Sequence, residues 1–106
     1  MSTAFDRLDA TIAARKTAGT GTSWTAQLLA KGPEKCAEKF GEEAIEAVIE
    51  AVRGDRDRLV AEGADVIYHL AVMLAARDLS LADVAAELTR REGRSGLDEK
   101  AARKPG

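Results

Sequence analysis

Two long segments joined by two residues decide the fold: PEKCAEKFGEEAIEAVIEAVR (33–53), then Gly54 and Asp55, then RDRLVAEGADVIYHLAVMLAAR (56–77). Both segments carry apolar residues at helical spacing, and Pro33 suits the first position of a helix. Gly54 is suited to end the first helix and Asp55 to cap the second. Because the turn is so short, the two helices are expected to pack antiparallel as a helical hairpin.

Three further helices are expected around this hairpin, over about residues 3–16, 24–31 and 81–92, with Ser23 and Ser80 as N-caps. Residues 17–23 have turn composition, which predicts a small flexible loop. Residues 94–106 form a basic C-terminal tail, either an arm or one more short helix. The sequence therefore predicts an all-α fold, a four- to five-helix bundle with a central antiparallel helical hairpin.

The chain has 106 residues, which is the length of one domain, so a single all-α domain over 1–106 is expected. Alanine makes up about a fifth of it, which favours close-packed helices. Large apolar residues are correspondingly few for a deep core in one small monomer. We therefore expect that homodimerisation completes the core.

Charge and hydropathy exclude several classes of protein. The 16 basic and 18 acidic residues give a net charge of −2, which disfavours non-specific binding to nucleic acid. No stretch approaches the ~18 apolar residues of a membrane span, and the first residues do not resemble a secretory signal. The single cysteine, Cys36, excludes an intramolecular disulfide framework. A cytoplasmic protein without a nucleic-acid or membrane partner is expected.

The hairpin carries two groups of polar residues. On a helical wheel, one arc of the first helix holds Glu38, Glu42, Glu43, Glu46 and Glu50. One edge of the second, otherwise apolar helix holds Glu62, Asp65 and His69. Carboxylates in a helix that is expected to be buried nearly all round are costly unless they are paired or bind a metal.

Because the facing helix offers mostly more acid, a shared divalent cation is expected. Oxygen ligands without thiolates indicate Mg²⁺, with Mn²⁺ as the alternative. Two simpler interpretations are a solvated acidic face and ion pairs that join the helices through Lys35, Lys39 or Arg58. His69, one turn after Asp65, is either a residue that orients this carboxylate or a satisfied core residue.

Carboxylate-bound Mg²⁺ keeps several waters and recruits substrate phosphates. The chain lacks a P-loop and a glycine-rich dinucleotide fingerprint, so helices, metal and basic side chains would have to hold a nucleotide. The candidate substrate-binding residues are Lys31, Lys35, Lys39, Arg91, Arg94 and Lys100.

The acidic motif is the point at which the sequence resembles a known family. Glu42-Glu43-Ala44-Ile45-Glu46 followed by Glu62-Gly63-Ala64-Asp65 resembles the signature of the all-α nucleoside-triphosphate pyrophosphatases, the MazG-like superfamily. The segment YHL at 68–70 and the segment REGRSG at 91–96 are similar to the narrower phosphoribosyl-ATP pyrophosphatase family. The resemblance covers about residues 5–104.

This resemblance implies Mg²⁺-dependent hydrolysis of 1-(5-phosphoribosyl)-ATP to 1-(5-phosphoribosyl)-AMP and pyrophosphate, the second step of histidine biosynthesis, by an all-α homodimer. Position by position, the implied metal ligands are Glu43, Glu46, Glu62 and Asp65. The implied catalytic residues are Glu42 and Glu43, with Glu42 either a ligand or a water-orienting base. Two alternatives stay open: a housecleaning pyrophosphatase acting on dUTP, dCTP or damaged triphosphates, and a non-catalytic helical dimer.

Overall fold

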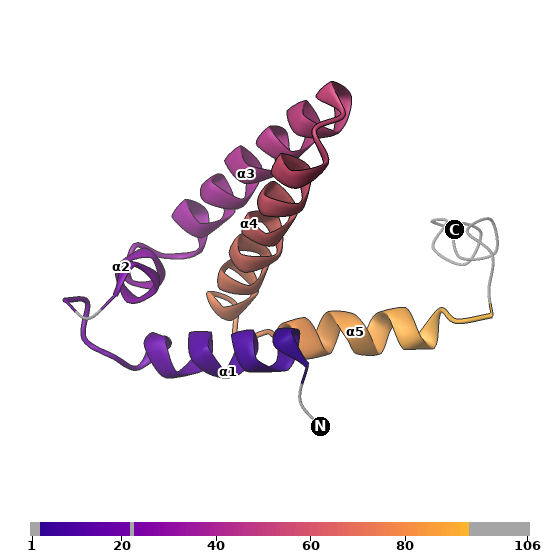
Figure 1. Ribbon diagram of the computed structural model, residues 1–106. Coiled ribbons are helices and arrows are strands. Elements are labelled where there is room, and N and C mark those ends of the chain that lie inside the picture. Colours follow the sequence, from indigo (N-terminus) through magenta and orange to yellow (C-terminus); the bar gives the residue numbers. More distant parts are fainter. Residues whose placement is uncertain (1–2, 22, 94–106) are drawn as a thin grey trace, which may run out of the picture.

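The computed structural model describes residues 3–21 and 23–93. Within these residues, five helices follow one another: α1 (Ala4–Lys16), α2 (Trp24–Ala30), α3 (Pro33–Arg53), α4 (Arg56–Ala75) and α5 (Leu81–Arg90) (Figure 1). These residues contain no strand, so the all-α prediction is confirmed, and each expected helix is present with ends that differ by a residue or two. Within the same residues, no helix has the length and hydropathy needed to cross a lipid bilayer.

The expected hairpin of α3 and α4 is present, with the two helices side by side and antiparallel (Figure 1). Pro33 begins α3, and Gly54 ends it in the left-handed region at a φ of 79°, where glycine is unstrained. The Gly54 N–H donates to the Glu50 carbonyl at 3.0 Å, and the Asp55 carboxylate accepts from the Arg58 N–H at 3.0 Å. Adjacent residues thus reverse the chain through their own backbone preferences.

Local capping also begins the other helices. Thr3 and Asp6 form a reciprocal capping box at α1, and Ser80 and Asp83 form another at α5. At α2, the Ser23 hydroxyl accepts from the Ala26 N–H at 2.9 Å. These contacts lie within four residues of one another, which explains why the helix starts could be predicted from sequence.

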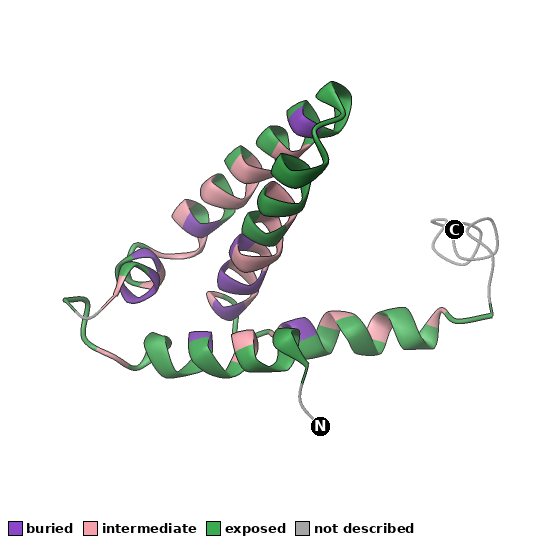
Figure 2. Cartoon of the chain, in the orientation of Figure 1, coloured by how far each residue is buried: buried purple, intermediate pink, exposed green. Residues whose placement is uncertain are grey.

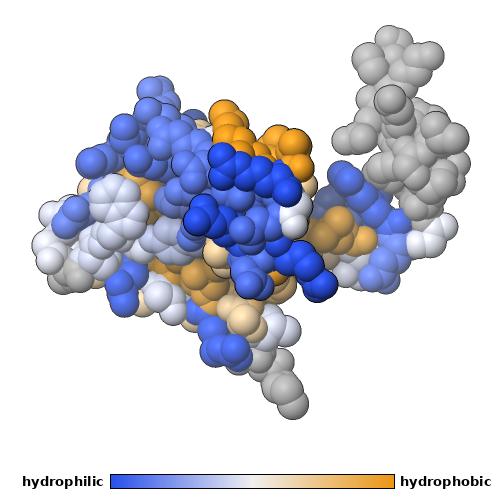
Figure 3. Space-filling view, turned by 45° about the horizontal axis from the view of Figure 1, so that its top comes forward, coloured by the Kyte–Doolittle hydropathy of each residue, from blue (hydrophilic) through white to orange (hydrophobic). Residues whose placement is uncertain are grey.

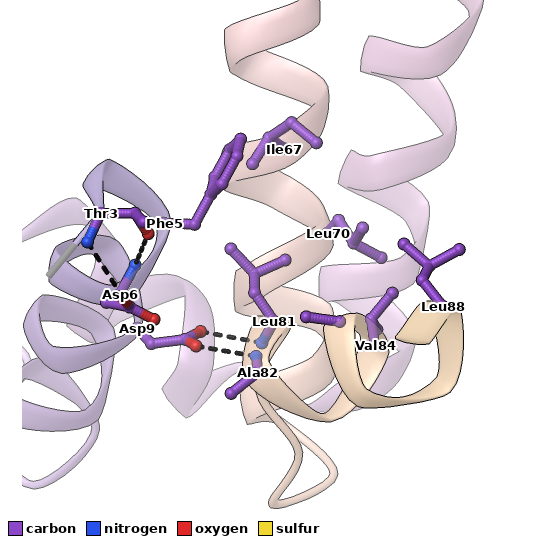
Figure 4. A pocket seen from close by; sticks show the side chains of 11 residues that line it. Thr3, Phe5, Asp6, Asp9, Ile67, Leu70, Leu81, Ala82, Val84 and Leu88 are labelled. Carbon is purple, nitrogen blue, oxygen red and sulfur yellow. Dashed lines mark hydrogen bonds between the residues drawn. The ribbon is translucent and has the colours of Figure 1, made fainter. Parts of the chain in front are cut away.

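Helix α1 is tied at two points, its middle and its C-terminal end, to the chain around the end of α4 and the start of α5. The Asp9 carboxylate accepts from the Leu81 and Ala82 N–H groups at 2.9 and 3.0 Å, at the start of α5 (Figure 4). At the C-terminal end of α1, Lys16 forms an ion pair with Asp78 and donates to the Ala75 carbonyl. These contacts hold α1 and α5 across the base of the hairpin.

The buried core lies at this base, where all five helices meet (Figure 2). Each helix contributes at least one residue to it: Ile12, Leu28, Cys36, Ala71, Val72, Ala75 and Leu81. Most of these side chains are small or medium-sized, so the core is thin, as the alanine-rich composition indicates. The outer half of the hairpin extends beyond the core and is largely exposed (Figure 2).

One expectation about α4 is wrong. The helix was expected to be buried nearly all round, but Leu59 and Val60 in its first turns are 36% and 74% exposed. The neighbouring stripe of α3 is exposed as well, and together these six residues form the hairpin apolar patch: Ile45, Val48, Ile49, Val52, Leu59 and Val60. Figure 3 shows hydrophobic side chains gathered beside the charged hairpin turn. The physical reason is that the part of the chain the structure describes supplies no helix to cover this end.

Candidate metal-binding active site

Three carboxylates from the two hairpin helices converge halfway along the hairpin. Glu43 comes from α3, and Glu62 and Asp65 come from α4, where their i, i+3 spacing places them on one helix face. One oxygen of each carboxylate lies within 4.8 Å of the others. Glu43 and Glu62 are half-buried and Asp65 is exposed, so this carboxylate cluster has one side open to solvent.

The environment of Glu62 disfavours its negative charge. Burial raises the pKa of this carboxyl, and the charges of Glu46, Glu43 and Asp65 and a hydrogen bond with Glu43 raise it further. Its Oε2 atom is buried and has no hydrogen-bond partner among the described residues. An unpaired, desolvated carboxylate oxygen among like charges is costly, and a divalent cation would compensate for it.

The donor set fits a hard divalent cation. Carboxylate oxygens suit Mg²⁺ and Mn²⁺, whereas thiolates favour softer metals. Cys36 does not add a thiolate, because it is fully buried in the core, its thiol donates to the Leu28 carbonyl, and burial raises its pKa. The residues present therefore fit a hard divalent cation.

The remaining acids of the motif, Glu42 and Glu46, are exposed residues of α3. Glu46 is exposed one turn along α3, close enough for its charge to raise the pKa of Glu62. Glu42 is also exposed, and its carboxylate accepts from Lys39 Nζ at 3.3 Å. Of the four metal ligands that the sequence predicts, Glu43, Glu62 and Asp65 form the tight group and Glu46 stands beside it.

The cations considered for ion pairs between the helices contact other carboxylates. On α3, Lys35 pairs with Glu38 at 3.0 Å. Arg58 lies 3.7 Å from Asp55 and 4.0 Å from Glu50, at the hairpin turn. Together with the Lys39–Glu42 pair, these contacts leave the carboxylate cluster outside the ion pairs that the alternative interpretation required.

The predicted substrate-binding residues lie in separate places. Lys31 Nζ lies 5.7 Å from the centre of the Trp24 ring, and Lys35 and Lys39 follow on the first turns of α3. Arg91 caps the far end of α5, away from the hairpin, and contacts Glu87 at 2.9 Å (Figure 1). Arg94 and Lys100 lie outside the described residues. One chain therefore gathers the three lysines at one end of α3 but does not bring Arg91 to them.

His69 has a place that the sequence did not indicate. Its Nε2 atom lies 3.9 Å from Glu43 Oε1, across the hairpin, although the spacing along the helix suggested Asp65 as its partner. The imidazole is buried and contacts the Tyr68 ring edge-on. Periodicity along one helix could indicate that His69 shares an edge with the acids, but it could not show which side chain of α3 faces it.

The all-helical fold and the carboxylate cluster across its central hairpin place the chain in the class of the all-α nucleoside-triphosphate pyrophosphatases. The acidic motif resembles the signature of the same class. Within this class, the family model described as phosphoribosyl-ATP pyrophosphohydrolase matches residues 5–92. The chain belongs to this family, which is a family of hydrolases.

Curated proteins similar to this chain carry the name phosphoribosyl-ATP pyrophosphatase. The relative from Paracoccus denitrificans is 71% identical over 102 residues, which cover 96% of this chain and 94% of that protein. The relative from Dinoroseobacter shibae is 73% identical over 97 residues, covering 92% and 95%. The relative from Ruegeria pomeroyi is 72% identical over 99 residues, covering 93% and 94%. The similarity thus extends over nearly the whole length of each pair.

Proposed function

We propose that this chain hydrolyses phosphoribosyl-ATP to phosphoribosyl-AMP and pyrophosphate, in the second step of histidine biosynthesis. Water cleaves the anhydride between the α and β phosphates, and its oxygen ends on one product phosphate while the protons are released or taken up by a base. The observation that carries the proposal is the carboxylate cluster across the hairpin, in a chain of this family whose relatives share about 70% identity. Residues 1–106 are taken as one catalytic unit.

Mg²⁺ is the proposed cofactor, with Mn²⁺ as a substitute. Glu43, Glu62 and Asp65 would hold the ion, and Glu46 would complete the set. When bound, the ion neutralises charge on the polyphosphate and on the carboxylates that hold it. The unpaired Oε2 atom of Glu62 supports this assignment, because it has no partner within the described residues.

The chain's own residues would orient water and bind phosphate. Glu42, the exposed neighbour of Glu43 on α3, is our candidate for the base that orients the attacking water, with Glu43 as the second candidate. A phosphate would compete with Glu38 and Glu42 for Lys35 and Lys39. The remaining proposed phosphate ligands are Lys31, Arg91, Arg94 and Lys100.

We also propose that the chain works as a homodimer in the cytoplasm. The hairpin apolar patch supports the dimer, because large apolar side chains that remain exposed in one chain are typical of surfaces between chains. The cytoplasm is proposed because a highly charged nucleotide does not cross a membrane unaided.

Release of pyrophosphate from phosphoribosyl-ATP by the purified chain tests this proposal. We expect turnover with Mg²⁺, loss of turnover with EDTA, and loss in Glu62→Gln, while Asp57→Asn, at an exposed position in the first turn of α4, serves as the control. An untouched substrate in the presence of bound metal would overturn the assignment. Rapid hydrolysis of dUTP or dCTP without hydrolysis of phosphoribosyl-ATP would favour the housecleaning alternative.

A further inference from the structure

We infer that His69 is a positioning residue for the carboxylate cluster, and that it acts by donating its Nε2–H to Glu43. The established likeness to the family does not require this role, and the sequence suggested a different partner. The inference rests on the proposed function, because it concerns how the chain holds its metal ligands.

The surroundings of His69 determine which ring nitrogen carries the proton. The residue is only 8% exposed, and Nε2 has a carboxylate oxygen of Glu43 3.9 Å away. Nδ1 is buried and has no hydrogen-bond partner among the described residues. A proton on Nδ1 would therefore be buried without an acceptor, while the lone pair on Nε2 would face a carboxylate. A proton on Nε2 avoids both costs, so the neutral ring carries it there.

Packing fixes the ring in this orientation. The Tyr68 and His69 rings meet edge to face, with their centres 4.9 Å apart and an angle of 81° between their planes. The Tyr68 hydroxyl in turn shares a hydrogen bond with Thr25, a buried residue of α2. Helix α2 thus holds the tyrosine, and the tyrosine ring packs against the imidazole.

The contact matters because Glu43 stands among repelling neighbours. Its carboxylate lies within 4.8 Å of those of Glu62 and Asp65, and like charges at this distance oppose the approach that a shared cation needs. At 3.9 Å, Nε2 and Glu43 Oε1 lie beyond hydrogen-bond distance, so the donation that we infer requires the two side chains to move closer when the site binds its ion. The donor would then orient the Glu43 carboxylate, whose second oxygen remains for the ion. Residues that hold metal ligands in this way contribute about 10- to 100-fold to metal affinity.

Binding of Mn²⁺ to the substrate-free chain, followed by electron paramagnetic resonance, tests the inference without any activity measurement. We expect His69→Met, which keeps the volume and loses the donor, to bind Mn²⁺ about 10- to 100-fold more weakly. We expect His69→Gln, whose amide nitrogen takes the place of Nε2, to recover most of the affinity. Thermal unfolding without metal, followed by circular dichroism, checks that both variants fold.

A second measurement uses the wild-type chain, so it does not depend on whether the variants fold. His69 is the single histidine of the sequence, and its ring nitrogens therefore give unambiguous ¹⁵N NMR signals. We expect the proton on Nε2 at neutral pH and a change of the Nε2 signal when Mg²⁺ is added.

The outcomes separate this inference from the proposed function. Equal Mn²⁺ affinity of the wild type, His69→Met and His69→Gln would overturn the positioning role alone. A proton on Nδ1, or an Nε2 signal that Mg²⁺ saturation leaves unchanged, would overturn it as well. A wild-type chain that binds neither ion would overturn the metal site of the proposed function and the role of His69 with it.

Discussion

At the scale of single residues, the site depends on an acid that folding places in an unfavourable environment. Glu62 is half-buried, its Oε2 atom is unpaired within the described chain, and its pKa lies above the ordinary value through burial and neighbouring acids. Functional sites often contain such groups, because the same features that destabilise the empty site favour a bound cation. A substitution that removes the charge of Glu62 should therefore raise the stability of the metal-free chain and lower its affinity for the metal.

Replacing Glu62 by Gln tests this opposition. Between the ordinary pKa and its raised value, the folded chain binds a proton that the unfolded chain has lost. The free energy of unfolding of the metal-free wild type therefore falls as pH rises through this window, and Glu62→Gln removes that part of the fall. Melting temperatures in EDTA between pH 4 and 8 measure both curves.

Addition of Mg²⁺ should make the wild type more stable than Glu62→Gln, which reverses their order of stability without metal. At a concentration of about 100 times its Kd, Mg²⁺ adds about 2.7 kcal/mol to the stability of the wild type and little to Glu62→Gln. Glu38→Gln, an exposed residue paired with Lys35, serves as the control and should respond to Mg²⁺ like the wild type. Identical pH curves for the wild type and Glu62→Gln would show that Glu62 is not under strain.

At the scale of elements, α5 shows how a short helix depends on its neighbours. It has ten residues, and an isolated helix of this length is marginal in water. Asp9 of α1 supplements the local capping box by accepting from two N–H groups at the start of α5. At the other end, Glu87 accepts from Arg90 and Arg91. Both ends of α5 are thus stabilised by charged contacts, one distant in sequence and one local.

The distant contact should contribute as much as a helix cap. We expect Asp9→Ala to lower the free energy of unfolding by about 0.5–2 kcal/mol, because two N–H groups at the helix start lose their acceptor. Urea unfolding followed by circular dichroism measures this difference. Asp57→Ala, at an exposed position in the first turn of α4, is the control and should have the smaller effect. An equal effect of the two substitutions would contradict the capping role of Asp9.

The contacts of Glu87 at the end of α5 should affect the stability of the chain at acid pH. Hydrogen bonds from Arg90 and Arg91, and their charges, lower the pKa of Glu87 from 4.5 to about 2. The stabilisation is complete above the ordinary pKa and is lost as pH falls from about 4.5 to about 2. Glu87→Gln should remove this pH dependence, which urea unfolding at pH 2–6 can detect. An unchanged acid limb in the variant would mean that solvent screens these pairs completely.

At the scale of the whole molecule, the buried core covers only part of the length of the hairpin. All five helices share the core at the base, while the hairpin extends past it and exposes its apolar patch. Figures 1 and 2 show that α1, α2 and α5 cover only one end of the hairpin. Such a surface is stable in water when a second chain covers it, which is the physical argument for the proposed dimer.

A charge in the apolar patch should separate the two chains without unfolding either. Val52 is 84% exposed, so Val52→Asp costs little in a single chain, whereas burying the charge in a dimer costs several kcal/mol. We expect the wild type to sediment as a dimer and Val52→Asp as a folded monomer. Thr89→Asp, at an exposed position of α5, is the control and should remain dimeric. A monomeric wild type at micromolar concentration would contradict the prediction.

Sequence alone determined the five helices and the hairpin, and it indicated the acids that the structure brings into the carboxylate cluster. Caps such as Ser23, the stop at Gly54 and helical periodicity act within a few residues, so they can be predicted without knowing what the chain packs against. The sequence also indicated a thin core, because composition limits how much apolar volume one chain can bury.

Tertiary structure alone decided which acids meet, which of them is desolvated and what His69 faces. Glu43 and Glu62 are distant in the chain, and their approach depends on the rotation and depth of α3 against α4. The same holds for Leu59 and Val60 in the first turns of α4, which are exposed because no third helix of the described residues covers them, whereas Val72 near the other end of the helix is buried. Periodicity specifies directions around one helix, whereas contact between helices is set by packing that no single segment encodes.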